Sequence, residues 1–306
     1  MTNVLILTLN KQNEKNYMLK KMNEVPGVCV LPTFKDFNLG MKVIWKFSMK
    51  LKIFWLVRFF LTDSVKSEIE NNDIVVCMAS HYSPTILKYI SKKYNKRCIN
   101  YFWDKISISG YPVNKSKEFE NWTFDIDDAN YYSLEYNPQF YVDSIKIDKK
   151  IKYDLTFVGA DRNGQWKNRT TLVKKYYKLF DEIGLKTFFY YVTKSTSIDE
   201  EIRHDKGLSN QEFIGVIGEG KAILEIVEPG REWLTQRPFL ALSNGIKLVT
   251  NNKKVKEMDF YSSDNIFVLE DDDIANLVDF LNSPMNMKIK LSYYSLSNWK
   301  ERFLAM

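Results

Sequence analysis

The stretch of residues 73–101 limits the fold of this 306-residue chain more than any other. The β-branched run DIVVCMA is followed by Ser83-Pro84, by the helix-like TILKYISKKY and by a second strand-like run, RCINY. Pro is favoured in the first turn of a helix, so Ser83-Pro84 marks the start of the helix. A strand, a helix and a strand over about 30 residues form a βαβ unit, and such units build parallel sheets.

The same alternation continues along the chain and predicts two α/β domains. A chain of this length favours two domains of about 150 residues each. We place the boundary in the polar stretch 143–152, because charged residues replace core residues there. Further strands are expected at residues 4–9, 153–159, 186–192, 222–227, 246–249 and 265–269, and further helices at 169–183, 209–216 and 274–281.

The composition is that of a globular protein of a reducing compartment. Hydrophobic residues make up 45% of the chain, which supplies a packed core, and the charged fraction of 27% argues against disorder. The three cysteines, Cys29, Cys77 and Cys98, form no C-x-x-C pair and predict neither a disulfide framework nor a zinc site. We expect no secretory signal, since no basic region followed by an apolar one opens the chain, and no membrane-spanning segment.

The net charge of +6 is concentrated in the first 60 residues. Such a basic region suits nucleic acid, an anionic membrane surface or a phosphorylated small molecule. Nucleic acid is not the expected partner, because the lysines cluster with apolar aromatic residues and no RNA- or DNA-binding module is recognisable.

Residues 41–62, MKVIWKFSMKLKIFWLVRFFLT, hold the densest mixture of cations and aromatic rings. Spacing of four residues puts three of the lysines on one face of a helix. Two interpretations stay open: an interfacial helix on an anionic membrane, or a packing helix with a solvated lysine face. The residues concerned are Lys42, Lys46, Lys50, Lys52, Trp45, Phe47, Phe54 and Trp55.

Residues just beyond the carboxyl ends of parallel strands are candidate site residues, because ligands of α/β sheets bind there. In the first domain these include His81 and Asp104. His81 is either a general base or phosphate-orienting group, or a packing residue ahead of the Ser83 helix. Asp104 is either a base for a hydroxyl nucleophile or the anchor of a turn.

In the second domain, Gly159 begins a Gly-containing loop that runs to Gly164 and is followed by basic residues. Glycines allow backbone N–H groups to approach a phosphate, and Arg162, Lys167 or Arg169 offers a cation to pair with it. The alternative is an ordinary turn with solvated arginines, since the loop has neither G-x-G-x-x-G nor Walker spacing.

The segment EIVEPGREWLTQRPFLALSNG, residues 225–245, contains a short helix bracketed by Pro238 near its start and Gly245 past its end. A helix that starts after Thr235 with Arg237 in its first turn can hold an anion. The later run Asp271-Asp272-Asp273 stands between a strand and a helix, so we interpret it as a helix N-cap rather than a metal site.

Several of these stretches together resemble one family. YDLTFVGADRNGQWKNR, EPGREWLTQRPFLALSNGIKLVTNN and FYSSDNIFVLEDDD resemble the C-terminal domain of bacterial GT-B glycosyltransferases, in particular the CgeB-like group and enzymes of lipopolysaccharide and capsule biosynthesis. CINYFWDKIS and WTFDIDDANYYSLEYNPQFY resemble the first-domain segments of the same group. The resemblance covers most of the chain apart from residues 41–62.

The resemblance implies an α/β fold of two Rossmann-like domains facing a central cleft. Residues 1–150 would form the acceptor-binding domain and residues 151–285 the nucleotide-sugar-binding domain. Residues 286–306 would form a C-terminal helix that packs back on the first domain.

The resemblance also assigns the donor site. Many retaining GT-B enzymes carry a Glu that contacts the donor sugar and, eight positions on, a Glu that binds the ribose. Glu232 matches the first, whereas the second position is Leu240, which cannot accept a hydrogen bond. Either Glu228 or a backbone carbonyl replaces the missing acceptor, or the motif does not apply. The expected donor-binding residues are Gly159, Arg162, Lys167, Glu228, Gly230, Glu232, Thr235 and Arg237.

The implied reaction moves a sugar from a nucleoside-diphosphate donor, expected to be a UDP-sugar, to a hydroxyl of a glycan or lipid-linked glycan precursor. No metal and no cofactor are expected, and the expected location is the cytoplasm, at the inner face of the membrane. If the reaction inverts, Asp104 or His81 takes the acceptor proton; if it retains, the departing phosphate assists. The alternative is a noncatalytic protein on the same fold that binds a nucleotide-sugar or a partner.

Overall fold

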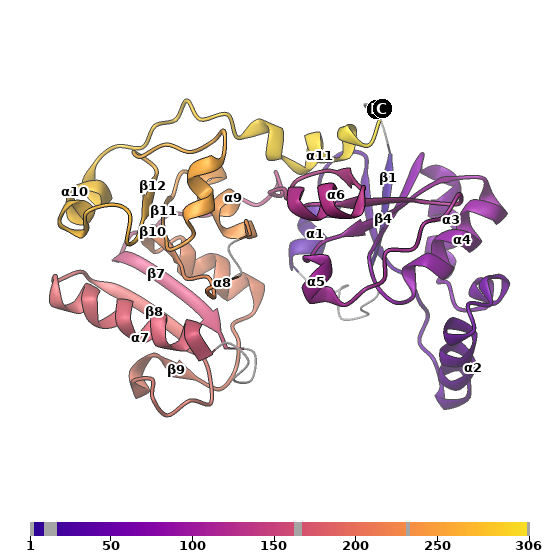
Figure 1. Ribbon diagram of the computed structural model, residues 1–306, viewed down its shortest axis with the longest axis horizontal. Coiled ribbons are helices and arrows are strands. Elements are labelled where there is room, and N and C mark those ends of the chain that lie inside the picture. The colour runs from indigo at the N-terminus through magenta and orange to yellow at the C-terminus, as the bar shows by residue number, and fades with distance from the viewer. Residues whose placement is uncertain (1–2, 9–16, 162–166, 231–232, 305–306) are drawn as a thin grey trace. The chain divides into compact units, whose positions relative to one another are not determined.

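A computed structural model describes residues 3–8, 17–161, 167–230 and 233–304 (Figure 1). The chain forms two compact units. Unit 1 comprises Met1–Ile145 together with Tyr294–Met306, and unit 2 comprises Lys146–Tyr293. The passage from unit 1 to unit 2 falls within the polar stretch 143–152.

The described part of unit 1 contains a six-stranded sheet in the order β2-β1-β3-β4-β5-β6, in which every neighbouring pair is parallel. Its strands are β1 (Val4–Thr8), β2 (Val28–Pro32), β3 (Ile74–Met78), β4 (Arg97–Phe102), β5 (Glu120–Thr123) and β6 (Glu135–Tyr136). Its helices are α1 (Tyr17–Asn23), α2 (Leu39–Lys50), η2 (Phe54–Phe59), α3 (Asp63–Asn71), α4 (Ser83–Tyr94), α5 (Ile106–Ser109), α6 (Ile126–Tyr132) and, from the end of the chain, α11 (Leu296–Arg302). The short helix η6 (Ser292–Tyr294) crosses the boundary at which the chain returns from unit 2 to unit 1.

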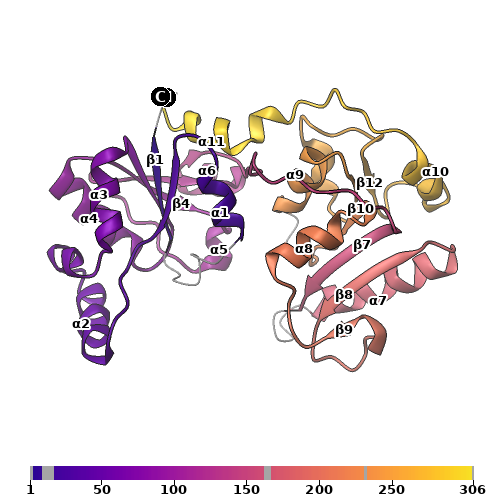
Figure 2. The same ribbon diagram turned by 180° about the vertical axis from the view of Figure 1, so that it is seen from behind.

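The described part of unit 2 contains a second six-stranded parallel sheet, in the order β12-β11-β10-β7-β8-β9 (Figures 1 and 2). Its strands are β7 (Tyr153–Ala160), β8 (Thr187–Val192), β9 (Arg203–His204), β10 (Gly220–Glu225), β11 (Lys247–Thr250) and β12 (Ile266–Val268). Its helices are α7 (Lys167–Glu182), η3 (Glu200–Ile202), α8 (Asn210–Ile217), α9 (Gln236–Ser243), η4 (Lys253–Glu257), η5 (Ile274–Asn276) and α10 (Leu277–Asn282).

Two parallel sheets with flanking helices confirm the predicted α/β class with two Rossmann-like domains. The βαβ unit is found as expected: β3 and β4 are parallel neighbours, and α4 between them has Pro84 in its first turn and ends at Asn95 in the left-handed region. Strand β1, which lies between β2 and β3, is buried along its whole length, which explains its unbroken apolar run.

The segment 41–62 differs from the single helix considered above. Helix α2 ends at Lys50, the backbone turns at Lys52 with φ of +54°, and η2 follows as a separate short helix. The segment also lies after the second strand of the chain rather than the first, because residues 28–32 form β2, which we did not predict.

The last helix, α11, packs within unit 1. Trp299 lies edge-on to Tyr101, with ring centroids 5.1 Å apart, and its backbone carbonyl accepts a hydrogen bond from the Asn137 side chain. Arg97 donates to the carbonyl of Phe303. Unit 1 is therefore completed by the end of the chain.

Candidate active site

The carboxyl edge of the unit 2 sheet gathers the buried polar residues of interest. Strands β7, β10 and β11 are parallel neighbours, so the residues that follow them come together at one edge. Helix α7 begins after β7 and helix α9 begins after β10, which brings two helix starts to the same edge.

Arg169 and Arg237 face one aromatic ring at this edge. Their guanidinium carbons lie 6.0 and 5.8 Å from the centre of the Phe157 ring. Arg169 comes from the first turn of α7 and donates to the carbonyl of Ala160 at 3.1 Å, whereas Arg237 comes from α9 and donates to the carbonyl of Val158. Both guanidinium groups are thus fixed to the end of β7.

The environment of the two arginines disfavours their charge. Burial, followed by the nearby Arg237 guanidinium, lowers the pKa of Arg169 to about 10. Burial also lowers the pKa of Arg237, and the Glu225 carboxylate opposes that effect. Two desolvated cations at one place are a characteristic of an anion-binding site.

Glu225 is the buried counter-charge of the pair. Its side chain is only 1% exposed, at the end of β10. One carboxylate oxygen accepts the hydroxyl of Thr250 at 2.7 Å, and the other accepts the hydroxyl of Thr235. The Glu225 carboxylate therefore ties the end of β11 and the start of α9 to β10.

The start of α9 offers less to an anion than the sequence suggests. The Thr235 hydroxyl already accepts the N–H of Arg237 at 3.1 Å, and Pro238 has no N–H. A ligand would meet the backbone N–H of Gln236, the positive end of the helix dipole and the Arg237 side chain.

Glu228 lies at the start of α7. One of its carboxylate oxygens accepts the backbone N–H of Arg169 at 2.6 Å. The turn that follows contains Gly230 with φ of +80°, a conformation that favours glycine. Glu228 thus occupies the position at a helix start where an anion would bind, while its second oxygen is the candidate acceptor for a ribose hydroxyl.

Gly159 is required where β7 passes the two arginines. A Cβ atom built there would meet the Phe157 ring at 2.6 Å and the Arg169 guanidinium at 3.3 Å. The close neighbours of Gly159 are therefore protein side chains, and its expected role beside a phosphate stays a prediction.

Of the other expected donor residues, Arg162 and Glu232 lie outside the described residues, and of Lys167 only its place at the first position of α7 is described. Leu240 is 8% exposed and forms part of the buried face of α9. Position 240 therefore contributes to the core.

Three residues of this edge were not on the expected list: Glu225, Thr250 and Arg169, the last noted only as a cation near the Gly loop. The one signal for Glu225 is a carboxylate inside the apolar run AILEIV. Thr250 carries no sequence signal, because its role depends on β11 lying beside β10.

His81 and Asp104, the expected catalytic residues, lie at the carboxyl edge of the unit 1 sheet. They follow β3 and β4, which are parallel neighbours, and both side chains are exposed. His81 packs edge-on against Tyr111, with ring centroids 5.1 Å apart. Next to Asp104, Lys105 pairs with Asp125 at 3.3 Å, which fixes the loop.

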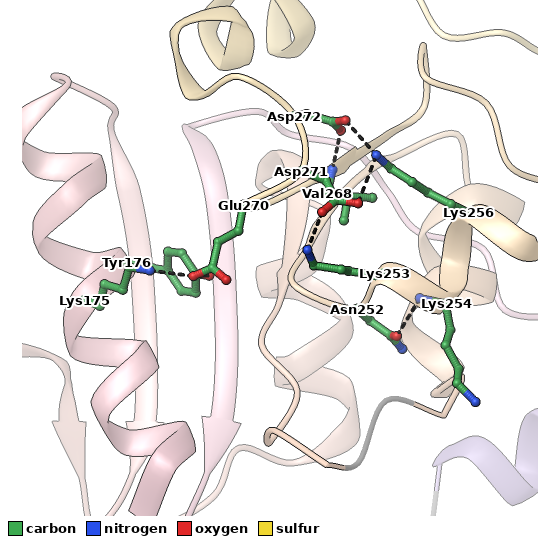
Figure 3. Close-up of polar contacts among 10 residues, drawn as sticks. All are labelled: Lys175, Tyr176, Asn252, Lys253, Lys254, Lys256, Val268, Glu270, Asp271 and Asp272. Carbon is green, nitrogen blue, oxygen red and sulfur yellow. Dashed lines mark hydrogen bonds and ion pairs between the residues drawn. The ribbon is translucent and has the colours of Figure 1, made fainter.

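The three aspartates at 271–273 have different contacts, and Figure 3 shows those of Asp271 and Asp272. Asp273 accepts the N–H of Ala275 and caps η5, which confirms the N-cap interpretation for this residue. Asp271 pairs instead with Lys253 and Lys256, and Asp272 accepts Lys256 at 2.9 Å. Among the residues that the structure describes, no group of three or more His, Cys, Asp or Glu side chains is arranged to hold a metal ion.

A scan against protein-family models finds no match, and a search of curated proteins finds none either. Solved structures do match. S. aureus MnaA in complex with UDP has a TM-score of 0.51 at 12% identity, over 99% of this chain and 95% of that one.

Two further structures match over most of their lengths. UDP-GlcNAc 2-epimerase from Neisseria meningitidis, bound to UDP-GlcNAc, has a TM-score of 0.50 at 9% identity, over 99% of this chain and 98% of that one. A DNA-modifying β-glucosyltransferase, whose substrate is uridine diphosphoglucose, has a TM-score of 0.51 at 13% identity, over 92% and 88%. With the two parallel sheets, these likenesses show that the fold is GT-B.

Proposed function

We propose that the protein is a glycosyltransferase that moves a sugar from a nucleoside-diphosphate donor, a UDP-sugar, to a hydroxyl of a glycan precursor. The observation that carries this proposal is the pair of arginines at the carboxyl edge of the unit 2 sheet, Arg169 and Arg237, on one Phe157 ring. Structural neighbours at this level bind UDP, UDP-GlcNAc or uridine diphosphoglucose, which supports the same class of ligand.

The chemistry of glycosyl transfer suits this edge. As the sugar departs, negative charge develops on the leaving diphosphate, and fixed cations stabilise that charge without the need for a metal ion. Arg237 is already held in place by Val158, so little ordering is needed when the diphosphate binds. The start of α9 adds its dipole.

The base that takes the proton of the acceptor hydroxyl would belong to unit 1. In an inverting reaction Asp104 or His81 would take the proton of the acceptor hydroxyl, and both side chains are exposed at a sheet edge, as a base that meets an incoming acceptor must be. We assign the acceptor to a lipid-linked precursor of a surface glycan, such as lipopolysaccharide or capsule. That places the enzyme at the inner face of the cell membrane.

The alternative function is the binding of a nucleotide-sugar without transfer. The observation behind this alternative is Leu240, a buried residue at the position where the motif of the transferases has a ribose-binding glutamate. An epimerase on the same fold is a third possible function, which the Neisseria meningitidis neighbour suggests. A single assay separates the three functions, because the labelled sugar ends in a different compound in each case.

The assay incubates the full-length protein with radiolabelled UDP-sugars and a lipid extract that contains glycan precursors. Transfer moves the label into the lipid fraction, epimerisation changes the sugar but leaves it on UDP, and binding alone leaves the donor unchanged. We expect transfer, and a transfer rate reduced at least about 100-fold in Asp104→Asn if Asp104 is the base. Asp36→Asn, at an exposed loop of the same unit, is the control. Label that stays on UDP with every donor and extract would reject the proposal.

A further inference from the structure

Helix α2 of unit 1 is apolar on two opposite faces. Met41, Trp45 and Met49 pack against the unit 1 core. Residues two positions away lie on the other side of the helix axis, and there the sequence again supplies apolar side chains. An ordinary surface helix would carry polar groups on that second face.

The second face is open to solvent. Leu39 is 81% exposed, Val43 61% and Phe47 60%. The short helix η2 also has one buried side and one exposed apolar side: Val57 is fully buried, whereas Trp55, two positions earlier, is 53% exposed. We call the exposed apolar set the α2–η2 surface, and its members are Leu39, Val43, Ile44, Phe47, Leu51, Trp55 and Phe59.

Cations border this surface, and the sequence segment that forms it contains no acidic residue. Lys42, Lys46 and Lys50 form a stripe between the buried and the exposed apolar faces of α2, and all three are exposed. The guanidinium of Arg58 lies 4.4 Å from the centre of the Phe59 ring. From residue 37 to residue 62 the sequence contains neither Asp nor Glu.

Figures 1 and 2 show α2 projecting from the rest of unit 1, away from the β1–β4 sheet. A projecting element presents its outer face to a flat partner more readily than to a groove. No helix among the described residues is long and apolar enough to cross a membrane, so contact through this element would be peripheral.

We infer that the α2–η2 surface docks unit 1 on an anionic lipid bilayer. The exposed apolar side chains insert at the level of the headgroups, and the bordering lysines pair with anionic lipid phosphates. A protein partner is the less suitable occupant, because lysine is depleted at protein–protein interfaces whereas it is the common cation of interfacial helices. This inference rests on unit 1 alone and not on the proposed donor site.

The structure divides the four aromatic residues named in segment 41–62 between the core side and the solvent side of unit 1. Trp45 is half-buried against Phe34 and Tyr82, and Phe54 packs against the same core. Only Phe47 and Trp55 of the four aromatic residues named above are available to lipid.

The test is co-sedimentation of the full-length protein with sucrose-loaded vesicles. One set is phosphatidylcholine alone, and the other contains about one-third phosphatidylglycerol. We expect sedimentation with the anionic vesicles, loss of most of it at high salt, and little with the neutral set. Lys42→Glu/Lys46→Glu/Lys50→Glu should weaken the partition coefficient at least about 100-fold, and Phe47→Ser/Trp55→Ser should weaken it at least about tenfold.

Matched controls make the same changes elsewhere on unit 1. Lys93→Glu/Lys115→Glu/Lys117→Glu alters the net charge equally at exposed positions, and Ile126→Ser/Tyr131→Ser removes exposed apolar side chains from α6. Both should retain wild-type vesicle binding. Unchanged melting temperatures would show that all four variants are folded.

Three results would overturn the inference. One is no sedimentation with anionic vesicles, and another is an equal loss in the charge-matched control. The third is a wild-type dimer in analytical ultracentrifugation that Phe47→Ser/Trp55→Ser converts to monomer, because a second copy would then cover the surface. Binding of UDP, measured in parallel, should be unaffected by every variant, so a failure here is distinct from a failure of the donor site.

Discussion

Arg169 and Arg237 place two guanidinium groups about the same Phe157 ring, with their central carbons 6.0 and 5.8 Å from its centre. Burial is the main cause that lowers the pKa of both groups, and for Arg169 the nearby Arg237 guanidinium lowers it further. Glu225 and Glu228 offset part of this cost. A diphosphate bound beside the pair would offset more, and donor binding should therefore stabilise unit 2.

Replacement of Arg237 by Ala tests its contact with the diphosphate. The loss of a charge-assisted hydrogen bond should weaken UDP binding roughly 10- to 100-fold in calorimetric titration. Arg203→Ala, at the half-buried strand β9 of the same unit, should leave the affinity unchanged. Equal affinities of Arg237→Ala and wild type would remove Arg237 from the site.

Glu225→Gln tests the buried carboxylate that joins β10, β11 and α9. The amide keeps the shape but not the charge, and it replaces one of two acceptor oxygens by a donor, so a hydroxyl of Thr235 or Thr250 loses its partner. We expect a loss of about 3 kcal/mol in the free energy of unfolding of unit 2, seen as a lower melting temperature. Glu257→Gln, at an exposed position, is the control and should have the melting temperature of the wild type. Equal stability of the two variants would contradict the role given to Glu225.

Gly159→Ala tests the close approach at the end of β7. The new methyl group would meet the Phe157 ring at 2.6 Å, and this ring is fully buried. Overpacking of this kind should lower the free energy of unfolding by about 1–3 kcal/mol. Gly215→Ala is the matched control, because no neighbouring atom lies within 4 Å of its Cβ in α8 and a helical alanine should be neutral or mildly stabilising. If Gly159→Ala and Gly215→Ala had the same free energy of unfolding, the Phe157 ring would be able to move aside at no cost, which would contradict the close approach as a constraint.

The Arg97–Glu120 pair should make the stability of unit 1 depend on pH. Burial alone would raise the pKa of Glu120, but hydrogen bonds from Arg97 at 2.6 Å and from Trp122 at 2.9 Å outweigh it and lower the pKa. Because the pKa is lower in the folded state, the stabilisation is complete above the unfolded value near 4.5 and is lost as the pH falls through the folded value.

Glu120→Gln should therefore cost about 1 kcal/mol of unfolding free energy at pH 7, since both partners are partly exposed. In urea unfolding, the difference from wild type should shrink as the pH falls below 4.5. Glu70→Gln at an exposed end of α3 should show no such difference. A gap between Glu120→Gln and wild type that persists at low pH would mean that shape, not charge, stabilises the pair.

The parts of the fold that follow from local pattern were predictable. The run DIVVCMA, the Ser83-Pro84 start and the run RCINY define β3, α4 and β4 almost to the residue, because each depends on neighbours in sequence. Strand β2 was not predicted because VCVLP is short and ends in proline. It is a strand because it pairs with β1. Strands β5 and β6, with four and two residues, depend on pairing in the same way.

The candidate site was predictable only where a residue type carries its own signal. Arg237 and Gly159 stand out in the sequence because a cation at a helix start and a glycine at a strand end each have a local meaning. The network of Glu225 with Thr235 and Thr250 has no such local signal. The two threonines are ten and 25 residues from Glu225 in sequence, and they meet it only because of the order of the strands.

The most direct test of the central claim is a calorimetric titration of the full-length protein with UDP, with uridine as the comparison. If the paired arginines receive the diphosphate, UDP should bind once per chain and at least about tenfold more tightly than uridine, with a dissociation constant in the micromolar to millimolar range. No heat of binding at millimolar UDP, or uridine bound as tightly as UDP, would contradict the assignment of this edge as the donor site.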